Sequence, residues 1–76
     1  MAKPQQFVRP ETPQCAVCKK QPHEIPIYVR FALMDGITAE DFVYMNEGTF
    51  DYRTNLFYCD KCYVKIGMPP GKAVPV

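Results

Sequence analysis

Cys15-Ala-Val-Cys18 and Cys59-Asp-Lys-Cys62 are the most specific motifs in this chain of 76 residues. They contain all four of its cysteines, and 40 residues separate them. A Cys-x-x-Cys pair can hold one side of a tetrahedral metal ion, so two pairs supply a complete set of four ligands. The spacing therefore predicts one metal centre formed by Cys15, Cys18, Cys59 and Cys62.

The expected metal is zinc. The start of the chain has no apolar run that would mark a signal peptide, and no stretch reaches the roughly 20 apolar residues of a membrane span. We therefore expect an intracellular, cytoplasmic protein without membrane contact, and a reducing compartment favours metal binding over two disulfides. Four thiolates suit zinc or iron, and because protein atoms fill all four positions, the prediction is one structural zinc ion.

Composition divides the chain into three parts. Residues 1–14 contain three prolines and three glutamines and are predicted to form a flexible N-terminal arm, and residues 68–76 are predicted to form a flexible, proline-rich C-terminal tail. Residues 15–67 remain as the zinc-binding domain. A domain of this size buries little apolar surface, so metal binding is expected to contribute a large part of its folding free energy.

The segment between the cysteine pairs begins with a predicted strand. Ile25 to Met34 is rich in β-branched and aromatic residues that recur at every second position, and Asp35-Gly36 is a tight-turn signal. Residues 38–46 fit either a short helix capped by Thr38 and stopped by Gly48, which we prefer, or a second hairpin strand. Residues 49–53 alternate as a further strand does.

The second cysteine pair is predicted to lie where a strand passes into a helix. Leu56 to Tyr58 is predicted to be a strand that ends at Cys59. The residues that follow contain no helix breaker until Gly67, which two prolines follow closely. Cys59 near the cap and Cys62 three residues later would fall on the same face of this helix.

A loop carrying Cys15-Ala-Val-Cys18, followed by strands and by Phe57-Tyr58-Cys59-Asp60-Lys61-Cys62 at a strand-to-helix junction, resembles a treble-clef zinc finger. The resemblance covers residues 15–67 and concerns a fold class, with no specific family. It implies a small, metal-stapled α+β domain with a β-hairpin core, a short C-terminal helix and four cysteine ligands to zinc; the alternative is an all-β zinc ribbon. The commonest knuckle has glycine directly after its second cysteine, whereas this chain has Lys19 and Tyr63 there. Their presence disfavours a symmetric ribbon and a rubredoxin-like iron site, which typically use two such knuckles.

The charges are balanced in number but uneven in position. Nine Lys and Arg residues face eight Asp and Glu residues, which disfavours binding driven mainly by electrostatics. The bases gather near the cysteines, where they either offset a negative zinc–thiolate centre or contact nucleic acid or a protein partner. These candidate contact residues are Lys19, Lys20, Arg30, Arg53, Lys61 and Lys65. All charged residues between Arg30 and Arg53 are acids. They are expected to form either a solvated face or a docking face for a basic partner.

Catalysis is not expected. The single histidine, His23, is interpreted as a surface or hydrogen-bonded side chain, and the chain has neither a glycine-rich phosphate loop nor a nucleophile elbow. We therefore expect a binding module, with no small-molecule substrate, that docks on a larger macromolecule, most simply a protein partner. Nucleic-acid binding through the basic residues is the second hypothesis, and a rubredoxin-like redox protein is the third.

Overall fold

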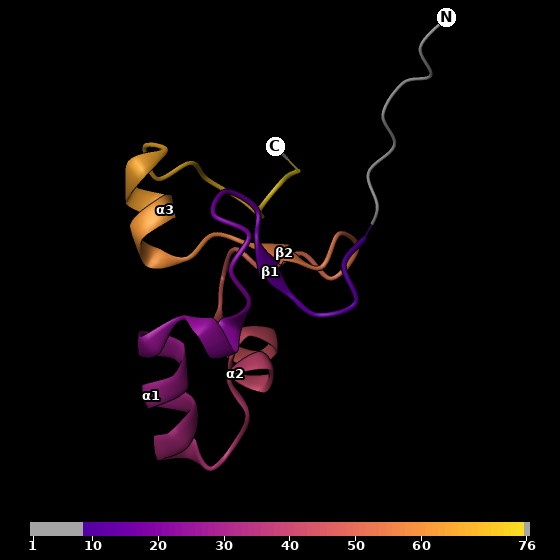
Figure 1. Cartoon of the computed structure of the whole chain (residues 1–76). Coiled ribbons are helices and arrows are strands. Elements are labelled where there is room, and N and C mark those ends of the chain that lie inside the picture. Colours follow the sequence, from indigo (N-terminus) through magenta and orange to yellow (C-terminus); the bar gives the residue numbers. More distant parts are fainter. Residues whose placement is uncertain (1–8, 76) are drawn as a thin grey trace, which may run out of the picture.

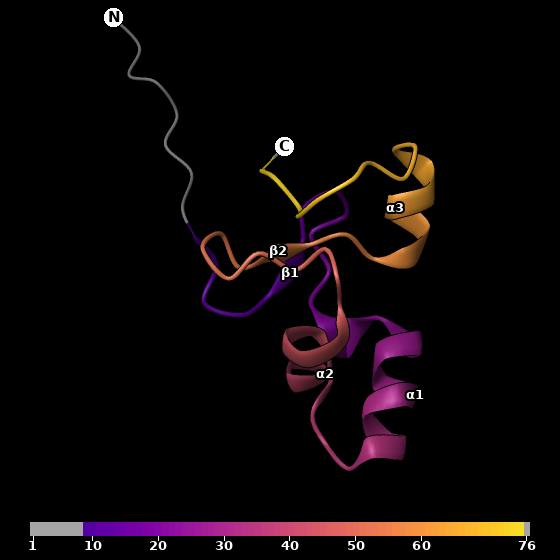
Figure 2. The ribbon, with the colours of Figure 1, turned by 180° about the vertical axis from the view of Figure 1, so that it is seen from behind.

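The computed structural model describes residues 9–75 (Figure 1). Its elements are, in chain order, β1 (Gln14–Cys15), the 3-10 helix η1 (Pro22–Glu24), α1 (Pro26–Asp35), α2 (Ala39–Asn46), β2 (Leu56–Phe57) and α3 (Asp60–Lys65). They confirm the small α+β class, and the three α-helices make the all-β ribbon alternative wrong. Helices α1 and α2 lie on one side of the strands, and α3 lies on the other (Figures 1 and 2). Within residues 9–75, none of the helices has both the length and the apolar character that crossing a membrane requires.

The two strands pair in parallel and bring together the segments that carry the two cysteine pairs. Gln14 lies opposite Leu56, and Cys15 lies opposite Phe57. The predicted β-hairpin core is wrong, because antiparallel pairing within the described residues is limited to one bridge between Asp51 and Leu56. Parallel neighbours run in the same direction, so the first cysteine pair and the start of α3 emerge at the same end of the sheet.

Helix α1 occupies the segment that the sequence predicts to be a strand, and that prediction is wrong. Pro26 is its first residue, where the fixed φ and the missing N–H of proline favour a helix. Ile25, Tyr28 and Ala32 recur at helical spacing and are buried in the core, whereas Ile27 is exposed. Burial of this one helical face therefore outweighs the β propensity of the branched residues.

The preferred helix within residues 38–46 is confirmed as α2. Thr38 is its N-cap, and the Thr38 hydroxyl accepts a hydrogen bond from the Asp41 amide at 3.0 Å. This bond satisfies one of the amides that a helix start leaves without a partner. Gly48 is not the stop, because the backbone is already extended at Glu47.

A turn between α2 and β2 replaces the strand predicted at residues 49–53. The Asp51 carboxylate accepts a hydrogen bond from the Arg53 amide at 2.9 Å, and the Asp51 carbonyl accepts one from the Asn55 amide at 2.7 Å. Asn55 has a φ of +58°, a left-handed conformation that asparagine tolerates better than most residues. The turn thereby returns the chain to β2.

Helix α3 ends at the predicted glycine. Gly67 has a φ of +93°, and its amide donates to the Val64 carbonyl at 3.1 Å. The Met68 amide donates to the Tyr63 carbonyl at 2.9 Å. These two bonds form a Schellman motif, which satisfies the last carbonyls of the helix.

The core has one part on each side of β2. Strand alternation directs Phe57 toward α1 and α2, and directs Leu56 and Tyr58 toward the C-terminal segment. The main cluster consists of Cys15, Ile25, Tyr28, Ala32, Ala39, Val43, Phe57, Cys59 and Cys62. The smaller cluster consists of Ala16, Leu56, Tyr58 and Ala73. Three of the four cysteines therefore belong to the same core as the two long helices.

The packed part of the chain extends beyond the predicted domain bounds of 15 and 67. Pro13 is buried, and the Pro10 carbonyl accepts a hydrogen bond from the Asn55 side chain at 2.8 Å. Ala73 is buried, and its amide donates to the Thr49 carbonyl at 2.7 Å. Both flanking segments thus contain anchored residues, and the parts of the predicted arm and tail at residues 1–8 and 76 lie outside the described residues.

Candidate metal centre

The first cysteine pair lies in a tight knuckle that begins at Cys15, the last residue of β1. The Cys15 amide donates to the Lys20 carbonyl at 2.9 Å, and the Lys19 amide donates to the Cys15 carbonyl at 3.0 Å. Lys19 has a φ of +67°, the left-handed conformation that glycine adopts without steric cost. Lysine therefore occupies the strained position at which the commonest knuckle has glycine. The hydrogen bonds of the knuckle form although the residue is not glycine.

The second cysteine pair lies at the start of a helix, as predicted. Cys59 is the N-cap of α3, and Cys62 lies in its first turn. The Tyr63 amide donates to the Cys59 carbonyl at 2.8 Å, which is the first hydrogen bond of the helix. Spacing of three residues in a helical turn places both cysteines on one face.

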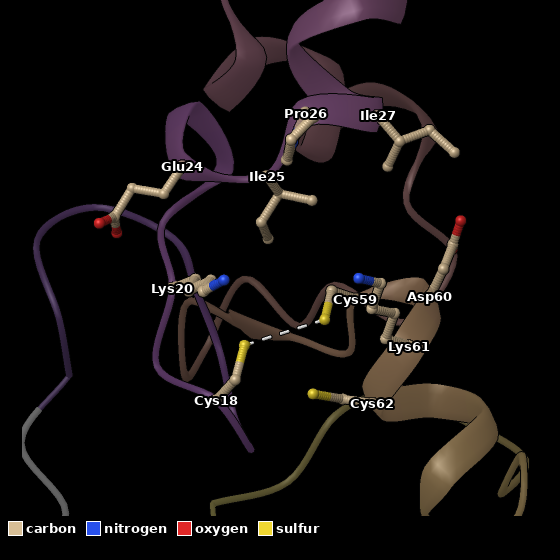
Figure 3. A pocket seen from close by; sticks show the side chains of 10 residues that line it. All are labelled: Cys18, Lys20, Glu24, Ile25, Pro26, Ile27, Cys59, Asp60, Lys61 and Cys62. Atoms are coloured by element: carbon tan, nitrogen blue, oxygen red, sulfur yellow. Dashed lines mark hydrogen bonds between the residues drawn. The ribbon is translucent and has the colours of Figure 1, made fainter.

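The four sulfur atoms form one cluster. All four Sγ atoms lie within 4.8 Å of one another, and those of Cys18 and Cys59 are 3.9 Å apart (Figure 3). A tetrahedral zinc ion with Zn–S distances of about 2.3 Å requires roughly 3.8 Å between its sulfurs. A disulfide requires about 2.05 Å, and all four cysteines are free thiols. The positions therefore fit the predicted metal ion.

The four thiols differ in their exposure and in the direction of their pKa shifts. Cys15, Cys59 and Cys62 are buried, whereas Cys18 is exposed. Burial acts to raise the pKa of Cys15, but backbone amides, those of Cys59, Cys18 and Val17, favour the thiolate and lower its pKa to about 7. Burial raises the pKa of Cys59 and of Cys62, and the charge of Cys15 acts in the same direction. A divalent cation bound among the four sulfurs would favour the thiolate form of the remaining cysteines.

A pocket of about 470 Å³ opens beside the cysteines (Figure 3). Ile25 points toward the sulfurs from the opposite wall, and Cys18, Cys59 and Cys62 face it. The remaining lining residues are Lys20, Glu24, Pro26, Ile27, Asp60 and Lys61. The pocket thus joins the metal centre to the first turn of α1.

The six basic residues predicted as candidate contacts lie on different parts of the structure. Lys20 and Lys61 line the pocket beside the cysteines. The Lys19 ammonium donates to the Ala16 carbonyl at 2.8 Å and so braces its own knuckle. The other three are Arg30 on α1, Lys65 on α3 and Arg53 in the turn before β2. The six therefore lie on four separate segments, and those nearest the sulfurs would offset the negative charge of a metal–thiolate centre.

His23 acts in the fold as a hydrogen-bonded surface side chain, as interpreted from the sequence. Its Nδ1 lies 2.9 Å from Oε2 of Glu40, which ties η1 to α2. Burial acts to raise the pKa of the Glu40 carboxyl, but the hydrogen bond with His23 lowers it below its ordinary value.

A polar network, missed from the sequence, links the helices to the strand that precedes Cys59. The Tyr28 hydroxyl donates to the Glu47 carboxylate. That carboxylate also accepts from the amide and the hydroxyl of Thr49, at 3.1 and 3.0 Å. The Thr49 hydroxyl oxygen in turn accepts from the Tyr58 amide at 2.9 Å. Burial and the bond to Glu47 raise the pKa of Tyr28, so its hydroxyl stays protonated and remains a donor.

The chain matches no protein-family model, no curated protein and no solved structure. The function is therefore inferred from the geometry of the site and of its surroundings.

Proposed function

We propose that this chain is a small binding module that folds around one structural zinc ion and docks on a protein partner. The observation that carries the proposal is the cluster of four cysteine sulfurs, all within 4.8 Å of one another. A knuckle with the first pair and a helix start with the second pair support a treble-clef-like site. Helices α1 and α2 stand where that fold class has its hairpin.

The zinc ion would be structural, because four thiolates fill its coordination positions. Three of these ligands belong to the main core cluster, so the ion would hold the knuckle, β2 and α3 together. Structural zinc in finger peptides has an apparent binding free energy of about 10–16 kcal/mol, whereas a core of this size contributes roughly 3–5 kcal/mol. Folding should therefore depend on the metal.

Zinc is favoured over iron by the difference between the two cysteine pairs. A rubredoxin-like iron site typically uses two similar knuckles, whereas here the second pair lies at the start of α3. A colourless preparation with one zinc per chain supports the proposal. Bound iron with strong visible absorption would support the redox alternative instead.

The surface favours a protein partner. Methionine is usually buried, yet Met34, Met45 and Met68 are 76%, 72% and 59% exposed. Large exposed apolar areas on a small protein mark sites of interaction with other macromolecules. A net charge of only +1 favours a protein over nucleic acid.

Native mass spectrometry and circular dichroism test the zinc proposal directly. We expect one zinc ion per chain, and loss of helical signal when a strong chelator removes it. Cys59→Ser should leave the chain largely unfolded at neutral pH. Val64→Ser is the matched control, because Val64 lies on the same helix two residues after Cys62 and is exposed, so it should retain both zinc and fold. A folded chain without bound metal would refute the proposal.

A further inference from the structure

Helix α1 is apolar on nearly all sides, although only one side of it is buried. Arg30 and Asp35 are its only charged residues. Tyr28 and Ala32 are buried against the core, whereas Leu33 is 80% exposed. A helix that is apolar all round is normally enclosed by its surroundings. The outer sides of α1 are therefore apolar but are not buried against other parts of the described chain.

The exposed apolar side chains continue from α1 onto α2. Ile27, Phe31 and Met34 have the spacing i, i+4, i+7 and share one face of α1. The Phe31 ring stacks on Phe42 of α2, with the ring centroids 5.6 Å apart. Met45 follows Phe42 by three residues and lies beside it on α2. We call these five residues the α1–α2 apolar surface.

Ile27 also joins this surface to the pocket beside the cysteines. The pocket has a volume of about 470 Å³ and apolar walls formed by Ile25, Pro26 and Ile27. Side chains that dominate the energy of an interface are commonly inserted into such pockets. The apolar walls of this pocket thus extend the α1–α2 apolar surface at one end.

The two helices that carry the surface are acidic. Residues 26–47 contain one base, Arg30, and four acids, which are Asp35, Glu40, Asp41 and Glu47. Glu40 is bonded to His23, and Glu47 is bonded to Tyr28. Asp35 and Asp41 are exposed and form no salt bridge within residues 9–75.

The two free acids border the α1–α2 apolar surface. Asp35 lies one turn after Phe31, and Asp41 lies one turn before Met45. A two-fold contact between copies of this chain would bring this acidic face against itself, and juxtaposed like charges disfavour association. Opposite charge on the occupant is favourable, which indicates a different, basic partner.

We propose that the α1–α2 apolar surface binds an amphipathic helix of a partner protein whose apolar stripe is flanked by Lys or Arg. This inference rests on the proposed function as a module that docks on a protein. Recognition of an amphipathic helix uses apolar anchors at i, i+3, i+4 and i+7, which the exposed apolar side chains of α1 and α2 can contact. Met34 and Met45 adapt to such anchors because their side chains are unbranched and polarizable.

A displayed library of helical peptides tests the proposal. The peptides carry a fixed apolar stripe of Leu, Ile, Phe and Met, the flanking positions are randomised, and the bait is the zinc-loaded protein. We expect the selected flanks to contain several-fold more Lys and Arg than Asp and Glu. Each favourable charge pair at an exposed rim changes affinity by up to about fivefold, so two acids produce a readable bias.

Three variants locate the binding of the selected peptides. Met34→Ser should weaken it about tenfold, because it removes an apolar contact from the surface. Leu33→Ser is the matched control, because Leu33 is equally exposed in the same turn but lies on the other flank of α1. Asp35→Lys should weaken binding of basic peptides several-fold while it favours the helix, because a cation at a helix C-terminus is stabilising.

The proposal is overturned if no peptide is enriched, if the selected flanks show no excess of bases, or if Leu33→Ser weakens binding as much as Met34→Ser. A dimer in sedimentation that Met34→Ser dissociates would also overturn it, because the occupant would then be a second copy. Zinc content measured on the same samples separates the two proposals. Full zinc occupancy without peptide binding refutes only this inference, whereas absence of zinc refutes the structural-zinc proposal.

Discussion

Replacing Lys19 by glycine and, separately, by alanine measures the backbone strain stored in the knuckle. Lys19 has a φ of +67°, and its ammonium donates to the Ala16 carbonyl at 2.8 Å. Both substitutions remove that hydrogen bond, which contributes about 0.5–1.5 kcal/mol. Only glycine also relieves the left-handed strain of about 1–2 kcal/mol, less about 0.4–1 kcal/mol for its greater freedom in the unfolded chain. We therefore expect Lys19→Ala to be less stable than the wild type by about 1 kcal/mol and Lys19→Gly to be close to the wild type.

The assay is thermal unfolding of the zinc-loaded proteins with free zinc held constant by a metal buffer, because zinc concentration shifts the apparent stability. A difference of about 1 kcal/mol corresponds to roughly 4–8 °C in the midpoint for a domain of this size. Lys20 is the matched control position, since it adjoins Lys19 but is not among the described residues with positive φ. At Lys20 alanine should be the more stable replacement, which reverses the order. Equal midpoints for Lys19→Gly and Lys19→Ala would refute the strained-knuckle interpretation.

Three further changes test other parts of the fold. Thr38→Ala should cost about 1 kcal/mol and speed hydrogen exchange at the Asp41 amide, which loses its partner; unchanged exchange would contradict the cap. Gly67→Val should lower the thermal midpoint by the equivalent of about 1–2 kcal/mol, because valine is strained at a φ of +93° although space around the residue is open. Glu40→Gln should lower stability at pH 7 through the weakened bond to His23. Since the folded pKa of Glu40 is lowered, that loss should shrink as the pH falls below 4.5, and a loss that grows instead would refute the assignment.

Local signals in the sequence predicted the cysteine cluster, the start of α2 and the end of α3. Ligand spacing, the Thr38 cap and the Gly67 stop each depend on a few neighbouring residues, so a single sequence contains the information. The conformation of the knuckle is also set by neighbouring residues. Lys19 adopts the positive φ at which the common knuckle has glycine, and the absence of glycine gave no sign of it in the sequence.

Features that depend on distant residues were not predictable in the same way. The period of two from Ile25 to Phe31 coincides with a helical spacing of Ile25, Tyr28 and Ala32, and only packing against α2 and Phe57 decides between them. The parallel pairing of β1 with β2 joins segments about 40 residues apart. The predicted strand at Leu56 to Tyr58 is confirmed as β2, but β1 has only two residues and carries no strand signal of its own, so the sequence did not show what β2 pairs with.

A chain of aromatic rings connects the cysteine cluster with the α1–α2 apolar surface. Phe57, two residues before Cys59, meets Tyr28 edge-on with ring centroids 5.5 Å apart. Tyr28 lies 5.9 Å from the ring of Phe42, and Phe42 stacks on Phe31 at the surface. Each ring is positioned by its neighbours, so a chain that lost a bound ion and the order of β2 would also lose the support of Phe31 and Phe42. Since zinc and the partner helix would both bind only the ordered state, each should raise the apparent affinity for the other.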